Sequence, residues 1–175
     1  TGELTAEIPF VIGNHDVLAA DVSRYGIEFH HEPVAADNRD EQEDRIRRLL
    51  RAGEIDLVVL ARYMQVLSPG FVADYPAQII NIHHSFLPAF AGARPYHQAH
   101  ERGVKLIGAT SHYVTHELDQ GPIIAQQTSA IGHRDTVEDL IRKGRDLERV
   151  VLATAVRLHL QDRILVSGNK TVVFE

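Results

Sequence analysis

Short apolar runs that alternate with helical patterns constrain the fold of this chain more than any other feature. The runs IPFVIGN (residues 8–14), DLVVLA (56–61) and AQIINIH (77–83) are apolar and end near breakers or polar residues, as buried strands do. Between two of them lies RDEQEDRIRRLLRAG (39–53), which carries acids early and arginines late, as the helix dipole favours. Strands that alternate with helices predict βαβ units and a parallel sheet.

The pattern changes after residue 103. LIGATSHYVT (106–115) and GPIIAQQTSA (121–130) are predicted strands joined by the short segment HELDQ, with no helix between them. One long helix follows over residues 135–163, with Asp135 or Thr136 as its cap, and ILVSGNKTVVF (164–174) predicts a hairpin around Gly168-Asn169. We therefore predict an α/β fold with a mostly parallel sheet, helices on both faces and a mixed C-terminal part.

Length and charge narrow the classes of function. The 175 residues suit one domain, which we expect to span residues 1–175. A net charge of -6 argues against nucleic acid as a partner, because phosphate binding needs a basic face. No apolar run approaches the roughly 18 residues of a membrane helix. The chain has no cysteine and 11 histidines, so ligand or proton-transfer roles for histidine need examination.

Two polar clusters follow predicted strands, at the edge of the sheet where α/β proteins bind ligands. The first is NIHHS, in which Asn81 and His83 are two residues apart and face the same way on an extended chain, while His84 points elsewhere. The second is HELDQG, in which Asp119 offers a carboxylate. An amide, an imidazole and a carboxylate together suit attack on a carbonyl carbon, with donors for the oxyanion and a base for the proton. On pattern alone, the interpretation of Asp119 as a turn residue before Gly-Pro is favoured over a catalytic role.

The histidine pairs also raise the possibility of a metal site. His97 and His100 are spaced for one helix face, and His112 and His116 lie close on a predicted strand, but neither pair has a third ligand at a telling spacing. We therefore predict no metal. The remaining histidines are interpreted as surface or hydrogen-bonded structural residues: His15, His30, His31, His133 and His159. No nucleotide-binding glycine fingerprint is present.

Long motifs in this chain resemble those of the formyltetrahydrofolate deformylases. The stretch NIHHSFLPAFAGARPYHQAHERGVKLIGATSHYVTHELDQGPIIAQ carries the resemblance, and VIGNHD and DLVVLARYMQVLSP fit it. The wider group is the formyltransferase-fold enzymes, whose loop typically reads NIHPS where this chain has NIHHS. The resemblance implies a Rossmann-like formyltransferase fold and a hydrolase that converts 10-formyltetrahydrofolate to tetrahydrofolate and formate. It also implies cytoplasmic one-carbon metabolism, formate supply for purine biosynthesis, a homo-oligomer, and no cofactor beside the folate substrate.

The resemblance assigns roles to particular residues. The catalytic trio of the family matches Asn81, His83 and Asp119. The family residues that support this trio correspond in this chain to His84, Ser85, Thr110 and His112. Folate-binding residues match two segments: Met64, Gln65, Val66 and Leu67, and Thr115, His116, Glu117 and Leu118. Most relatives carry an acid where this chain has His116.

Two other functions stay open at this stage. A formyltransferase would pass the formyl group to an amine such as glycinamide ribonucleotide, and a folate-binding module would bind without turnover; a zinc-binding protein is a weaker third alternative. The resemblance further implies a regulatory ACT domain and a first strand upstream of TAEIPFVIGN, so we expect the chain to be a catalytic-domain fragment that lacks both.

Overall fold

The computed structural model describes residues 4–35, 38–88 and 94–174. The chain divides into two compact units, Thr1–Asp56 and Leu57–Glu175, and each is described by itself. The expectation that residues 1–175 form one domain stays a prediction. Residues 89–93, which belong to the family-like stretch quoted above, lie outside the described residues.

The first unit is built on a pair of parallel strands. Strand β1 (Phe10–Gly13) pairs with β2 (Glu28–His31), and the connection between them carries the 3-10 turn η1 (Asp16–Leu18) and helix α1 (Ala19–Ser23). Helix α2 (Arg39–Ala52) follows and is tied to the chain after β2, because Arg45 Nε donates to Glu32 Oε2 at 2.7 Å. This unit is the βα pattern that the sequence predicts.

The second unit carries a four-stranded sheet in the order β3 (Val58–Leu60), β4 (Ile79–His83), β5 (Leu106–Tyr113) and β6 (Ile123–Ala130). Strands β3 and β4 are parallel, whereas β4–β5 and β5–β6 are antiparallel. The mixed C-terminal part is confirmed. Antiparallel pairing takes a larger share than predicted, because β4 and β5 also run antiparallel, although the helical segment Pro95–Glu101 lies between them in the chain.

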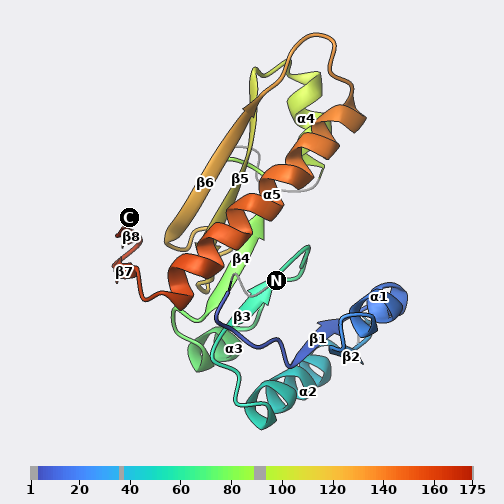
Figure 1. Cartoon of the computed structure of the whole chain (residues 1–175), viewed down its shortest axis with the longest axis vertical. Coiled ribbons are helices and arrows are strands. Elements are labelled where there is room, and N and C mark those ends of the chain that lie inside the picture. The colour runs from blue at the N-terminus through green and yellow to red at the C-terminus, as the bar shows by residue number, and fades with distance from the viewer. Residues whose placement is uncertain (1–3, 36–37, 89–93, 175) are drawn as a thin grey trace. The chain divides into compact units, whose positions relative to one another are not determined.

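The described residues of this unit form three helices: α3 (Pro69–Asp74), α4 (Pro95–Glu101) and α5 (Val137–Leu160). Ser68 caps α3, since its hydroxyl accepts from the Phe71 N–H at 3.1 Å. Helix α5 runs along β5 and β6 (Figure 1) and covers the core of the sheet. The buried residues of that core include Ile80, Ile82, Ala109, Tyr113, Ile124, Val151, Ala155 and Leu158.

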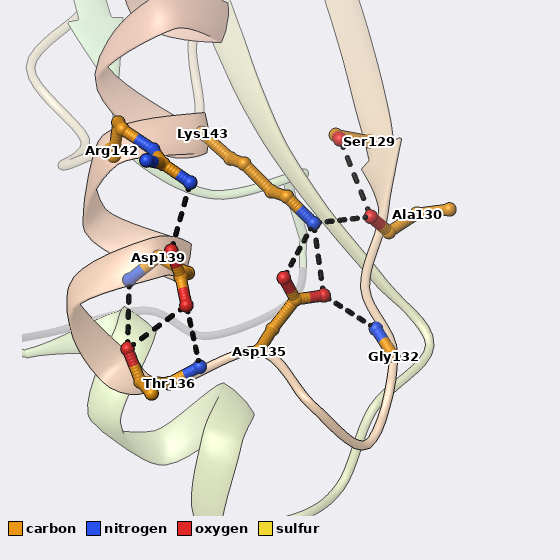
Figure 2. Close-up of polar contacts among 8 residues, drawn as sticks. All are labelled: Ser129, Ala130, Gly132, Asp135, Thr136, Asp139, Arg142 and Lys143. Atoms are coloured by element: carbon orange, nitrogen blue, oxygen red, sulfur yellow. Dashed lines mark hydrogen bonds and ion pairs between the residues drawn. The ribbon is translucent and has the colours of Figure 1, made fainter.

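The ends of α5 are well defined. Thr136 is its N-cap (Figure 2). The Thr136 hydroxyl accepts from the Asp139 N–H, and the Asp139 carboxylate accepts from the Thr136 N–H, so both backbone donors at the start of the helix have partners. Lys143 then reaches back to both carboxylate oxygens of Asp135 at 2.9 Å, which fixes the turn that enters the helix. Beyond α5, β7 (Ile164–Ser167) and β8 (Lys170–Val173) form the predicted hairpin, with Gly168 in a left-handed conformation at φ 58°. Within the described part of the chain, no helix combines the length and apolar character needed to cross a membrane.

Candidate active site

The register of β4 and β5 sets the polar face of the site. Asn81 lies opposite His112, and His83 lies opposite Thr110. Directly opposed residues of an antiparallel pair share a face, and alternate residues point the other way. Ile80 and Ile82, which alternate with Asn81 and His83 along β4, therefore face the core under α5. Strand alternation thus separates the polar side chains of NIHHS from the apolar ones.

Asp119 reaches this face from the turn between β5 and β6. Its Oδ2 lies 3.3 Å from His83 Nδ1, and its backbone is left-handed at φ 55°. Gly121 lets the turn approach this closely, because a Cβ at that position would overlap the Tyr113 carbonyl oxygen. The structure therefore brings together all three residues of the predicted catalytic trio.

His112 lies between the other polar groups and orients them. Its Nδ1 is 2.8 Å from the Tyr113 carbonyl oxygen, which can only accept, so Nδ1 carries the proton. In the neutral ring Nε2 is then an acceptor, and the Asn81 amide Nδ2 donates to it at 3.3 Å. The same Nε2 lies 3.7 Å from Asp119 Oδ1. The strand carries a bulge at Ser111/His112, a distortion that often re-aims a side chain beside a site.

His83 is buried, with 5% of its surface exposed. Burial lowers the pKa of His83 below its usual value of 6.5; the Asp119 carboxylate opposes this shift, and the His84 and His112 rings add to it. The neutral ring therefore dominates at pH 7. Because Nδ1 faces the carboxylate, it holds the proton, and Nε2 is left as a buried atom with no hydrogen-bond partner. An unpaired buried imidazole nitrogen costs free energy and is suited to exchange a proton with a bound substrate.

The prediction that His84 points away from His83 is wrong. The two rings stack, with centroids 5.0 Å apart and an interplanar angle of 25°, and both line the same pocket. Strand β4 ends at His83, so His84 no longer follows the alternation of an extended chain and turns back over its neighbour.

Thr110 fixes the chain that leaves β4. Its fully buried hydroxyl donates to the Ser85 carbonyl at 2.9 Å and accepts from the Leu87 N–H at 3.1 Å. Gln126 on β6 donates to the same hydroxyl at 2.9 Å. Thr110 and Ser85 thus hold the segment that carries His83 and His84, while their own side chains stay out of the pocket lining.

A pocket of about 560 Å³ opens beside these residues. Exposed apolar side chains border it at Met64, Val66 and Leu118, which is typical of a small-molecule site. Seven of the eight predicted folate-binding residues line the pocket, together with the catalytic trio; His116 does not, and its side chain is 74% exposed. Among the described residues, no group of three or more His, Asp or Glu side chains is arranged to hold a metal ion.

Sequence reasoning missed one side of this pocket. The missed lining residues come mainly from the chain after β3, from α4 and from α5: Arg62, Arg94, Pro95, Tyr96, His97, Ile141, Arg145 and Glu148. One signal was available, because Gly144 interrupts an otherwise regular helical pattern and such a glycine usually has a packing reason.

The formyl transferase profile matches residues 1–156 of this chain. The chain belongs to the formyl transferase family. A curated relative from Synechocystis sp., named formyltetrahydrofolate deformylase, is 61% identical over 174 residues; the match covers 99% of this chain and 61% of the relative. The chain thus spans about three fifths of that relative's length.

Solved structures support the same assignment. A formyltetrahydrofolate deformylase from Pseudomonas syringae superposes with a TM-score of 0.96 at 53% identity, over 99% of this chain and 58% of that one. A glycinamide ribonucleotide transformylase from Symbiobacterium toebii gives a TM-score of 0.91 at 34% identity, over 99% of this chain and 84% of that one. The Rossmann-like formyltransferase fold predicted from the sequence is confirmed.

Proposed function

We propose that this formyl transferase family member hydrolyses 10-formyltetrahydrofolate to tetrahydrofolate and formate. The observation that carries the proposal is the pair formed by buried His83 and half-buried Asp119, at 3.3 Å, in a pocket with exposed apolar borders. The relatives named formyltetrahydrofolate deformylase support the choice of substrate. In this proposal the pterin lies against the segments 64–67 and 115–118, and the formate released feeds purine synthesis in the cytoplasm.

The proposed reaction begins with attack of water on the formyl carbon. The Asp119–His83 pair takes one proton from the water as the C–O bond forms. That proton resides on His83 Nε2, which is unprotonated and without a partner in the resting site. The developing negative charge on the formyl oxygen favours the imidazolium, because an opposite charge close by stabilises the charged form.

The tetrahedral intermediate then needs donors for its oxyanion. The Asn81 amide has two N–H groups, of which one is donated to His112 Nε2, and the other is available to the substrate. A preorganised donor of this kind typically lowers the barrier by about 3–4 kcal/mol. The C–N10 bond then breaks, N10 takes the proton from His83, and formic acid leaves and ionises to formate.

Replacing Asp119 tests this mechanism. In Asp119→Asn the neutral amide no longer stabilises the imidazolium that forms when His83 takes the proton, so formate release should fall by about 10²–10⁴-fold, the usual worth of general acid–base catalysis. Formate and tetrahydrofolate would be measured together, with Asp146→Asn as control, because Asp146 makes only an exposed pair with Arg149 on α5. Near-normal turnover of Asp119→Asn would reject the assignment. Folate binding without any formate from the unaltered protein would instead indicate a non-catalytic binding module.

The second candidate is formyl transfer to an amine. It is favoured by the likeness to the transformylase from Symbiobacterium toebii, which this chain covers to 84%. Both reactions need the same oxyanion donors and base, so the trio does not separate them. Product analysis with and without an added amine distinguishes the two.

A further inference from the structure

Tyr96 on α4 lies beside the stacked histidines and bonds to α5. Its ring centroid is 6.3 Å from that of His84, and its hydroxyl donates to Glu148 Oε1 at 2.6 Å. Tyr96, His84 and Glu148 all line the pocket that holds the catalytic trio. The ring therefore occupies the side of the pocket that adjoins α5, one ring beyond His83.

A glycine on α5 makes room for this ring. Gly144 is buried in the middle of the helix, one turn before Glu148, and a Cβ there would overlap the hydroxyl and two ring carbons of Tyr96. Glycine in a helix interior is unfavourable relative to alanine, so its presence at this contact is best explained by the close approach of the ring.

The hydroxyl is held firmly as a donor. Burial raises the pKa of Tyr96, and the bond to the Glu148 carboxylate raises it further, so the phenol stays protonated. A short bond from a neutral donor to a carboxylate is among the stronger hydrogen bonds in proteins. It anchors the ring at the one carboxylate on this side of the described pocket, and so keeps that carboxylate from an incoming cation or amine.

We propose that Tyr96, seated at Gly144 and held by Glu148, is a specificity-determining residue that fills the space an amine acceptor would need. Water then remains the nucleophile that reaches the formyl carbon. This inference rests on the proposed hydrolysis. It explains how a site with the same catalytic groups as a transferase would favour hydrolysis over formyl transfer.

The chemistry for an admitted amine is balanced in the same way as hydrolysis. The amine nitrogen forms a bond to the formyl carbon and gives one proton to the Asp119–His83 pair. The C–N10 bond breaks, and N10 takes up that proton. The products are tetrahydrofolate and the N-formyl amine, and no formate forms in that turnover.

The experiment measures how product divides between formate and formyl amine. Purified full-length protein would turn over 10-formyltetrahydrofolate with glycinamide or hydroxylamine present, and tetrahydrofolate, formate and formylated amine would each be quantified. With the unaltered protein, formate should account for almost all of the tetrahydrofolate formed at every amine concentration, with only a small share of formyl amine. In Tyr96→Ala the share of formyl amine should rise about tenfold or more, the discrimination that filling a pocket typically provides.

Two further variants keep the test decisive if Tyr96→Ala folds poorly. Gly144→Ala should displace the ring and raise the formyl amine share in the same direction. The double variant Tyr96→Ala/Gly144→Ala should match Tyr96→Ala alone, since no ring remains to displace. Tyr113→Phe is the matched control: it also removes a buried tyrosine hydroxyl bond, to His159 at 2.8 Å, but Tyr113 does not line the pocket, and its product ratio should stay unchanged.

The product ratio separates this inference from the function on which it rests. Absence of formate with the unaltered protein would reject the hydrolase proposal itself. The role of Tyr96 would be overturned if the unaltered protein hydrolyses its substrate normally and both Tyr96→Ala and Gly144→Ala still transfer the formyl group only to water. A general loss of rate with an unchanged ratio would likewise assign Tyr96 a merely structural role.

Discussion

At the scale of single residues, the site depends on how closely the Asp119 turn approaches β5. Gly121 has no Cβ, and this allows the turn to pass against the Tyr113 carbonyl. The contact decides whether the Asp119 carboxylate stays 3.3 Å from His83 or moves out of range. A shift of about 1 Å in a catalytic group can cost about 10²-fold in rate.

We therefore predict that Gly121→Ala lowers formate release by about 10²-fold or more, while the protein still folds. The added methyl group displaces the turn and carries Asp119 away from His83. Gly132→Ala is the control, because the nearest atom to a Cβ at that position lies 3.9 Å away. Steady-state kinetics and circular dichroism would be compared for both, and equal activity of the two variants would contradict the role given to Gly121.

The lowered pKa of His83 predicts the acid limb of the activity profile. His83 accepts a proton in the proposed reaction, so it must begin neutral, and kcat/KM should fall only as the pH drops below 6.5. The charge of His84 contributes to the lowering. His84→Gln should therefore move the acid limb to higher pH, whereas the exposed His133→Gln should leave it in place. An acid limb above pH 6.5 in the unaltered protein would contradict this role.

At the scale of elements, sequence patterns predicted what is local. The hairpin at Gly168 and the capped start of α5 each depend on residues a few positions apart. The side-chain directions of Asn81 and His83 followed from strand alternation alone. The position of His84 could not be predicted, because it depends on β4 ending one residue earlier.

Other features of the site depend on contacts between distant segments. The bond from Tyr96 to Glu148 joins residues 52 positions apart, and no local pattern predicts which helical residue faces α4. The bulge at His112 is likewise a property of the β5–β6 pairing. Periodicity indicates which face of an element is apolar, but it does not identify the segment that packs there.

The start of α5 gives a prediction at this scale. Thr136→Ala removes the side-chain oxygen that accepts from the Asp139 N–H (Figure 2), and the free energy of unfolding should fall by about 1 kcal/mol. Ser129→Ala serves as control, because its hydroxyl makes only a 3.5 Å contact with the Ala130 carbonyl. Urea unfolding followed by circular dichroism measures both, and equal midpoints would show that the cap contributes nothing.

At the scale of the whole molecule, two histidines with lowered pKa link stability to pH. Burial favours the neutral forms of His83 and His159 in the folded state. The unfolded chain binds protons near pH 6.5, whereas the folded chain binds them only at lower pH. The stability that these groups provide is therefore complete above pH 6.5 and is lost as the pH falls toward their folded-state pKa values.

We predict that the unfolding free energy decreases between pH 7.5 and pH 5, with a slope of at most about 1.4 kcal/mol per pH unit for each histidine. His159→Gln should flatten this slope, since it removes one of the two groups. The carboxylates at the start of α5, whose pKa values are lowered by hydrogen bonds, add a further loss only below about pH 4.5. Thermal melts at a series of pH values test whether the histidine-linked loss of stability comes before the carboxylate-linked loss as the pH falls. A constant Tm from pH 7.5 to 5 would contradict the prediction.

Helix α5 has consequences for how this protein can evolve. The same 24-residue helix buries Val151, Ala155 and Leu158 in the core and lines the pocket with Arg145 and Glu148. Substitutions that reshape the acceptor side of the pocket therefore act on the element that covers the sheet. Selection for a new acceptor would meet a loss of stability early, and compensating changes are expected along the core-facing stripe of α5, several turns away from the chemistry.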